Sequence, residues 1–186
     1  GLHPYEAVAF QFSHHIMESD GGVRHAGEFL LAEPGTFPNY WFARALKNAL
    51  DNDKGTVFMW SHHENTILDK IVGQLVNDPD PPADMPELCI FIRSLIKEGS
   101  RAMVDLKVLA QKAYFHPDTK GSNSIKKVLP AVLGHSQFLK GTYQRPIYGA
   151  LDGIPSKNYK DQIWWAQDSN GNVIDPYNLL KEQAKD

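Results

Sequence analysis

The 186-residue chain lacks several features that would assign it to a specialised class of protein. Its single cysteine, Cys89, excludes an internal disulfide; it lies in the apolar stretch ELCIFIRSLI, where a thiol packs as a small hydrophobic group. No apolar run approaches the roughly 18 residues that a membrane-spanning helix needs, and no signal peptide is visible. We therefore expect a protein of the reducing cytoplasm, with no membrane partner.

The chain also lacks a strong excess of either charge. A formal net charge of −3 gives no global sign of nucleic-acid binding, although a local basic patch could still provide one. A Gly-Lys-Ser/Thr phosphate loop, a Cys/His pattern with zinc spacing and internal repeats are all missing. The length suits one domain over residues 1–186, irregular and rich in aromatic residues from about 135. The opening GLHPYEAVAF, without methionine, suggests a piece of a longer protein.

What is present is an alternation of strand and helix patterns. Two strands joined by the turn ESDGG are followed by helical segments that alternate with short apolar strands. Two paired strands followed by this alternation predict a three-layer α/β domain with a mixed sheet flanked by helices. The expected strands are 7–16, 21–33, 55–60 and 102–106, and the expected helices are 40–52, 64–76, 87–98 and 122–134, the last interrupted or re-angled at Pro130.

Histidines and a glutamate lie side by side in WSHHENTILDKI, residues 60–71. His62 and His63 are adjacent, so they point in different directions in either a strand or a helix and do not easily share one metal ion. The pair at 14–15 meets the same objection. We expect these histidines to face solvent or pack at a helix start. A histidine-based metal protein is a further alternative, which a finding of stoichiometric zinc would support.

Glu64 has two interpretations. Ser61 and Glu64 match the S-x-x-E capping box, which would make the glutamate structural. Glu64 also continues the apolar stripe of residues 67, 68, 71 and 75 at the head of the helix, just past a central strand. Open α/β sheets bind ligands at that position, which favours a functional acid.

Asp105 raises the same question, because it interrupts the apolar strand AMVDL. It is either a helix cap for the following segment or a site residue at the strand end. Carboxylates such as Glu64 and Asp105 suit Mg²⁺ or Mn²⁺ better than zinc.

The segment KGSNSIKKVLP is a third candidate, for phosphate contact. Its hydroxyls and lysines precede or begin a helix, whose free N–H groups can hold a phosphate. The alternative is a capped helix with lysines on its solvent-exposed face. The residues concerned are Lys120, Ser122, Ser124, Lys126 and Lys127. The C-terminal aromatic residues could stack on bases, but a small satellite core explains them as well.

Several stretches, in order, resemble a bacterial domain family of unknown function: PYEAVAFQFSHHI, GTVFMWSHHENTIL, MVDL, KGSNSIKKVLPAVL and YGALDG…VIDPYNLL. That family is grouped with the DnaQ-like, DEDD-type 3′–5′ exonucleases of the ribonuclease H fold and often follows a RecB-like PD-(D/E)XK nuclease module. The resemblance runs from about residue 4 to 180. It implies a ribonuclease H-like mixed sheet, DNA or RNA as partner, and a neighbouring nuclease domain.

The resemblance also implies a two-metal mechanism with Mg²⁺ or Mn²⁺, in which four acids hold two ions about 3.5–4 Å apart. Glu64 falls at the family's second acidic motif, as catalytic residue and metal ligand. Asp105 falls at the family's Asp-Leu position, as a supporting residue. The first motif, Asp-x-Glu on an opening strand, and the last, near a C-terminal helix, are absent from the chain.

We therefore expect a fold without its first strand, which exposes a sheet edge. The expected function is a metal-dependent nuclease domain that is inactive as this fragment. The alternative is a non-catalytic module that binds nucleic acid or interacts within a larger nuclease protein.

Overall fold

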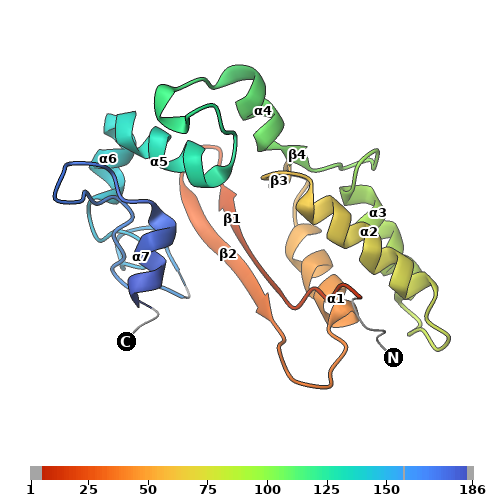
Figure 1. Ribbon diagram of the computed structural model, residues 1–186. Coiled ribbons are helices and arrows are strands. Elements are labelled where there is room, and N and C mark those ends of the chain that lie inside the picture. Colours follow the sequence, from red (N-terminus) through yellow and green to blue (C-terminus); the bar gives the residue numbers. More distant parts are fainter. Residues whose placement is uncertain (1–5, 157, 184–186) are drawn as a thin grey trace. The chain divides into compact units, whose positions relative to one another are not determined.

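The computed structural model describes residues 6–156 and 158–183 (Figure 1). The chain divides into two compact units. The first contains the residues up to His14 together with Ala26–Leu106, and the second contains His15–His25 together with the residues from Lys107 onward.

The predicted hairpin is present, formed by β1 (Gln11–Met17) and β2 (Val23–Leu30). In its turn, the Glu18 N–H donates to the Gly22 carbonyl at 2.8 Å, and Gly21 has a φ of 84°, a conformation that glycine adopts without strain. β1 starts later than the expected residue 7 because the Ala9 N–H bonds to the Asn39 side chain.

Helices α2 (His63–Val76) and α3 (Met85–Leu95) form the centre of the first unit and lie side by side in Figure 1. Their apolar faces meet through four side chains that are fully buried: Ile71, Leu75, Ile92 and Leu95. Helix α1 (Asn39–Leu50) packs against α3 and adds aromatic residues to the same core. The three helices were predicted from helical periodicity, and all three are confirmed.

Asn39, at the start of α1, is fully buried and holds the segment before β1 in place. Its side-chain oxygen accepts from the Ala9 N–H at 2.8 Å, and its amide donates to the Ala7 carbonyl at 3.2 Å and to Gln74 of α2. Gln74 also donates to the Ala7 carbonyl at 2.9 Å. Every donor and acceptor here has a partner, which is what makes a buried polar cluster stable.

Arg101 holds the other end of α1. Its guanidinium donates to the backbone carbonyls of Leu50 and Gly55 and pairs with Asp53 at 3.2 Å. The carbonyl of Leu50 belongs to the last turn of the helix, where carbonyls have no partner within the helix. One side chain therefore caps α1 and fixes the loop that leads to β3.

The sheets are smaller than the sequence suggested. β3 (Phe58–Met59) and β4 (Val104–Asp105) pair in parallel, with Phe58 opposite Val104 and Met59 opposite Asp105. Within the described residues, the strands form two separate two-stranded sheets, β1–β2 and β3–β4, instead of one mixed sheet. The mixed α/β class is confirmed.

In the second unit the chain runs through α4 (Leu106–Ala113, whose first residue belongs to the first unit) and the short 3₁₀ helix η1 (Pro117–Thr119). It continues through α5 (Ile125–His135) and α6 (Gln137–Tyr143), and an irregular segment then leads to α7 (Pro176–Gln183). α5 continues through Pro130. The indole of Trp165 is buried and donates to the carbonyl of Leu133 at 2.8 Å. Trp165 therefore packs as the satellite-core interpretation predicts.

None of the helices in the described parts of the chain combines the length and the apolar character required to cross a membrane.

Candidate functional site

The connection between β3 and α2 carries Glu64 and has an unusual backbone. Ser61 has a φ of 80°, which is uncommon for a residue with a side chain. Its N–H donates to Oδ1 of Asp105 at 2.9 Å. Because Asp105 ends β4, the neighbour of β3, its carboxylate ties the ends of both strands to the start of α2. The contact shown for Asp105 is thus one that positions the backbone of Ser61.

The capping box expected for Ser61 and Glu64 is wrong. The residue before the first turn of α2 is His62, which makes no side-chain capping bond, and the helix begins at His63. Ser61 lies one residue before the N-cap position, and its φ of 80° is not the extended conformation of a typical N-cap residue. His62 and His63 are exposed, as predicted for solvent-facing histidines.

The side chain of Glu64 is therefore not used to cap the start of the helix. It lies in the first turn of α2, where the helix dipole favours a negative charge. Its side chain is exposed, and it makes no hydrogen bond or ion pair with any other residue that the structure describes. The carboxylate is therefore available to a ligand.

Glu64 also lines an apolar cavity of about 540 Å³ in the first unit. One wall comes from residues 8–14, which include the first half of β1, and another comes from residues 57–59 around β3. Helices α1 and α2 close it with side chains such as Leu46 and Ile67. Its few polar side chains are Gln11, Ser13, His14, His63 and Glu64.

Two buried polar atoms flank Glu64 along the chain. Nε1 of Trp60 and Oδ1 of Asn65 have no hydrogen-bond partner among the described residues. Buried donors and acceptors are nearly always paired in folded proteins, so these two atoms are exceptions to that rule.

The metal expected from the resemblance can be compared with the ligands present. Within residues 6–156 and 158–183, Glu64 does not belong to a group of three His, Cys, Asp or Glu side chains close enough to share an ion. A two-ion centre needs several carboxylates. The residues around Glu64 do not fit such a centre by themselves.

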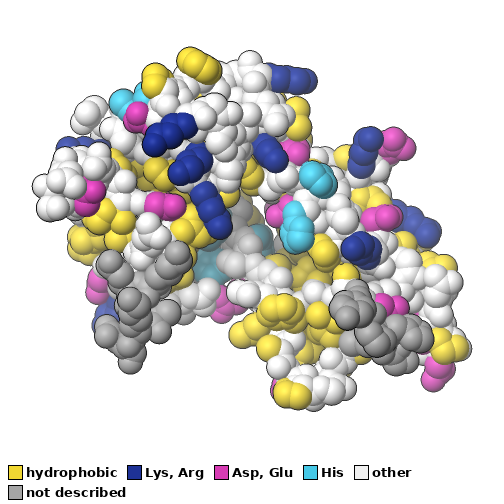
Figure 2. All heavy atoms as spheres, viewed as in Figure 1, with side chains coloured by type: hydrophobic (Ala, Val, Ile, Leu, Met, Phe, Trp, Pro, Cys, Tyr) yellow, Lys and Arg dark blue, Asp and Glu magenta, His cyan; other side chains and the backbone are white. Residues whose placement is uncertain are grey.

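The candidate phosphate-contact residues all belong to the second unit. Ser124 is the N-cap residue of α5 but makes no side-chain capping bond; Ser122 Oγ accepts from the Ser124 N–H at 3.3 Å. Lys120, Lys126 and Lys127 are exposed, and Figure 2 shows Lys and Arg side chains gathered over α5. The Nζ of Lys126 lies 5.7 Å from the centre of the Tyr177 ring.

The model of one protein family, the domain of unknown function DUF2779, matches residues 1–124, well over half of the chain. The chain belongs to this family. Neither the curated proteins nor the solved structures contain a match. The DUF2779 match includes Glu64 and Asp105 and ends at Ser124, so Lys126 and Lys127 lie beyond it.

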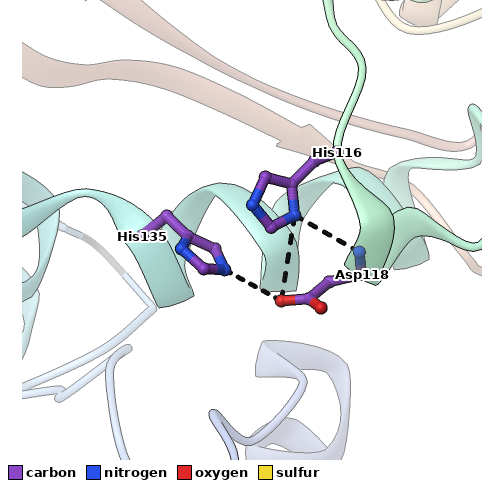
Figure 3. A group of neighbouring side chains, drawn as sticks. All are labelled: His116, Asp118 and His135. Carbon is purple, nitrogen blue, oxygen red and sulfur yellow. Dashed lines mark hydrogen bonds and ion pairs between the residues drawn. The ribbon is translucent and has the colours of Figure 1, made fainter.

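A cluster that sequence reasoning missed straddles the end of the DUF2779 match. His116, Asp118 and His135 direct their side chains toward one another (Figure 3). Asp118 Oδ2 lies 2.9 Å from His135 Nε2 and 3.8 Å from His116 Nδ1. Only the spacing His-x-Asp was visible in the sequence, and Asp118 and His135 are 17 positions apart. No standard metal motif has that spacing.

Proposed function

We propose that this chain is part of a ribonuclease H-like, DnaQ-related nuclease domain that acts on nucleic acid with Mg²⁺ or Mn²⁺. Glu64 is the acid that the chain contributes, and Asp105 positions it. On its own the chain does not cleave, because one carboxylate does not make the two-ion centre that such a reaction uses.

The observation that carries the proposal is the place of Glu64. It lies in the first turn of α2, shortly after β3, makes no bond with any described neighbour and lines the apolar cavity of the first unit. The order of elements around Glu64 is compatible with the proposal, since the hairpin β1–β2 is followed by helix α1, strand β3 and helix α2. A strand inserted beside β1 would bring its own side chains to the same cavity.

Mg²⁺ or Mn²⁺ would supply charge stabilisation and an activated water in such a domain. Glu64 alone offers one or two oxygen ligands, and Mg²⁺ fills its remaining positions with water or substrate phosphate. The expected result for this chain is weak metal binding without turnover.

The test is degradation of 5′-labelled single-stranded DNA and RNA in Mn²⁺ by this chain and by a version extended at both ends. We expect stepwise shortening by the extended version alone and its loss in Glu64→Gln. The matched control is Glu33→Gln, because Glu33 is also exposed, lies in the first unit and does not line the cavity. Cleavage that survives Glu64→Gln would refute the role of Glu64.

A second candidate is a non-catalytic nucleic-acid-binding module, which the exposed lysines of the second unit favour (Figure 2). In that case neither version cleaves, and the chain binds labelled single strands with an affinity that falls as salt rises. The substitution Lys126→Glu with Lys127→Glu then abolishes binding, whereas Lys70→Glu with Lys97→Glu, on exposed positions of the first unit, retains it. Absence of both cleavage and binding would reject both functions.

A further inference from the structure

We propose that His116, Asp118 and His135 form a binding site for one divalent transition-metal ion of the zinc type in the second unit. This site is separate from the proposed role of Glu64 and does not depend on it, because the two lie in different units and offer different ligand atoms.

The distances fit a single ion. One ligand atom from each of the three residues lies within 4.8 Å of the other two. In a tetrahedral zinc site with metal–ligand bonds of about 2.0–2.2 Å, neighbouring ligand atoms are about 3.4 Å apart. The separations of 2.9 Å and 3.8 Å from Asp118 Oδ2 bracket that value, so small side-chain rotations would complete the geometry.

The hydrogen bonds within the cluster also suit a cation. His116 Nδ1 accepts from the Asp118 N–H at 3.3 Å, so its lone pair is directed toward Asp118. A metal would compete only with this long hydrogen bond. His135 Nε2 donates to Oδ2 of the Asp118 carboxylate at 2.9 Å. An ion would displace the His135 proton and take over the contact.

The three ligands come from elements that already pack together. η1 contacts α5, which carries His135 near its C-terminal end. The Thr119 hydroxyl, which is buried, donates to the His116 carbonyl at 2.7 Å, and the Tyr114 ring lies nearly parallel to the His116 ring. These contacts hold His116 in place before a metal binds.

The donor set selects the metal. Two imidazoles and one carboxylate suit Zn²⁺, Co²⁺ or Ni²⁺, whereas Mg²⁺ and Ca²⁺ prefer oxygen ligands alone. Three protein ligands leave one position for water, as in zinc sites that are open to a substrate.

The direct test is titration of the chain with Co²⁺, followed by visible absorption, with Zn²⁺ competition. We expect one ion per chain and at least a tenfold loss of affinity in His135→Gln and in His116→Gln. The matched control is His62→Gln, since His62 is also exposed but belongs to no group of three metal-ligating side chains among the described residues. Circular dichroism of each variant shows whether it is folded.

A second measurement separates a site from non-specific association. Zn²⁺ should raise the unfolding temperature of the unmodified chain and leave that of His135→Gln unchanged, because only an ion that binds the folded state stabilises it. Absence of stoichiometric binding by the unmodified chain, or equal binding by all variants, would overturn the proposal. Neither outcome bears on Glu64, which is tested with Mn²⁺ and nucleic acid.

Discussion

Tyr40 shows how one buried side chain links stability to pH. The residue is nearly inaccessible, and its hydroxyl donates to Oδ2 of Asp78 at 3.0 Å. Burial, and then the hydrogen bond to Asp78 and its charge, raise the pKa of the phenol well above its usual value. The folded protein therefore holds this proton more tightly than the unfolded chain does.

The direction of the pH effect follows from that shift. A raised pKa contributes stability that is fully present below the pKa of the unfolded chain, about 10 for tyrosine, and is lost as the pH rises above it. We expect the free energy of unfolding to fall above pH 10 and to fall less steeply in Tyr40→Phe. The variant should also lose about 1 kcal/mol at pH 7, because it lacks the hydrogen bond.

Urea unfolding between pH 7 and 11.5 measures both effects. Tyr177→Phe is the control, since it removes a phenol that is considerably more exposed. Tyr114, Tyr143 and Tyr148 also have raised pKa values because of burial, so part of the alkaline loss should remain. An alkaline decline that is identical in Tyr40→Phe would contradict the assignment.

The backbone conformation of Ser61 could not be predicted from the residues next to it in the chain. The sequence S-x-x-E is a fair signal for a capping box, but it does not reveal that Ser61 adopts a φ of 80°. That conformation depends on Asp105, which is 44 residues away in the chain and accepts from the Ser61 N–H. A contact between distant segments overrode the local pattern.

At the scale of elements, Arg101 is the clearest case of a side chain that holds two segments together. Its guanidinium is largely buried and bonds two backbone carbonyls and Asp53. Lysine carries the same charge but lacks the fork of donors. We expect Arg101→Lys to lower the free energy of unfolding by about 1–3 kcal/mol, the range for hydrogen bonds to charged groups.

Chemical denaturation gives this value directly. The control Arg93→Lys lies on an exposed face of α3, where a substitution should cost less than about 0.5 kcal/mol. Equal stability of Arg101→Lys and the unmodified chain would show that the carbonyls are satisfied equally well without the guanidinium.

Helices were easier to predict than strands. α1, α2 and α3 each repeat apolar residues at helical spacing, and they begin and end close to the expected residues. The expected strand over 55–60 shrinks to Phe58–Met59, because strand length depends on the partner and not on composition alone. The cluster of His116, Asp118 and His135 depends on the packing of η1 against α5, which periodicity does not encode.

At the scale of the whole molecule, each unit has buried apolar residues of its own. The core cluster of the first unit includes Ile92, which is fully buried. The second unit buries Val128, Leu133 and Trp165. Units with separate cores can open separately.

We therefore expect Ile92→Ala to destabilise the first unit by about 2–5 kcal/mol, the usual cost of such a cavity. Hydrogen exchange should show faster exchange in α2 and α3 and unchanged protection of the Trp165 indole N–H, which bonds to Leu133. Leu133→Ala should give the reverse pattern. Loss of protection throughout the chain in both variants would mean that the units unfold as one.

The boundary between the units limits where the chain can be divided. It falls within β1, between His14 and His15, and again within β2, between His25 and Ala26. A single cut after Leu106 would deprive the second unit of residues 15–25, including His15, whose ring bonds to the Tyr148 hydroxyl. Neither unit is therefore one continuous segment of the sequence. Recombination that exchanged one unit would need junctions at three places in the chain.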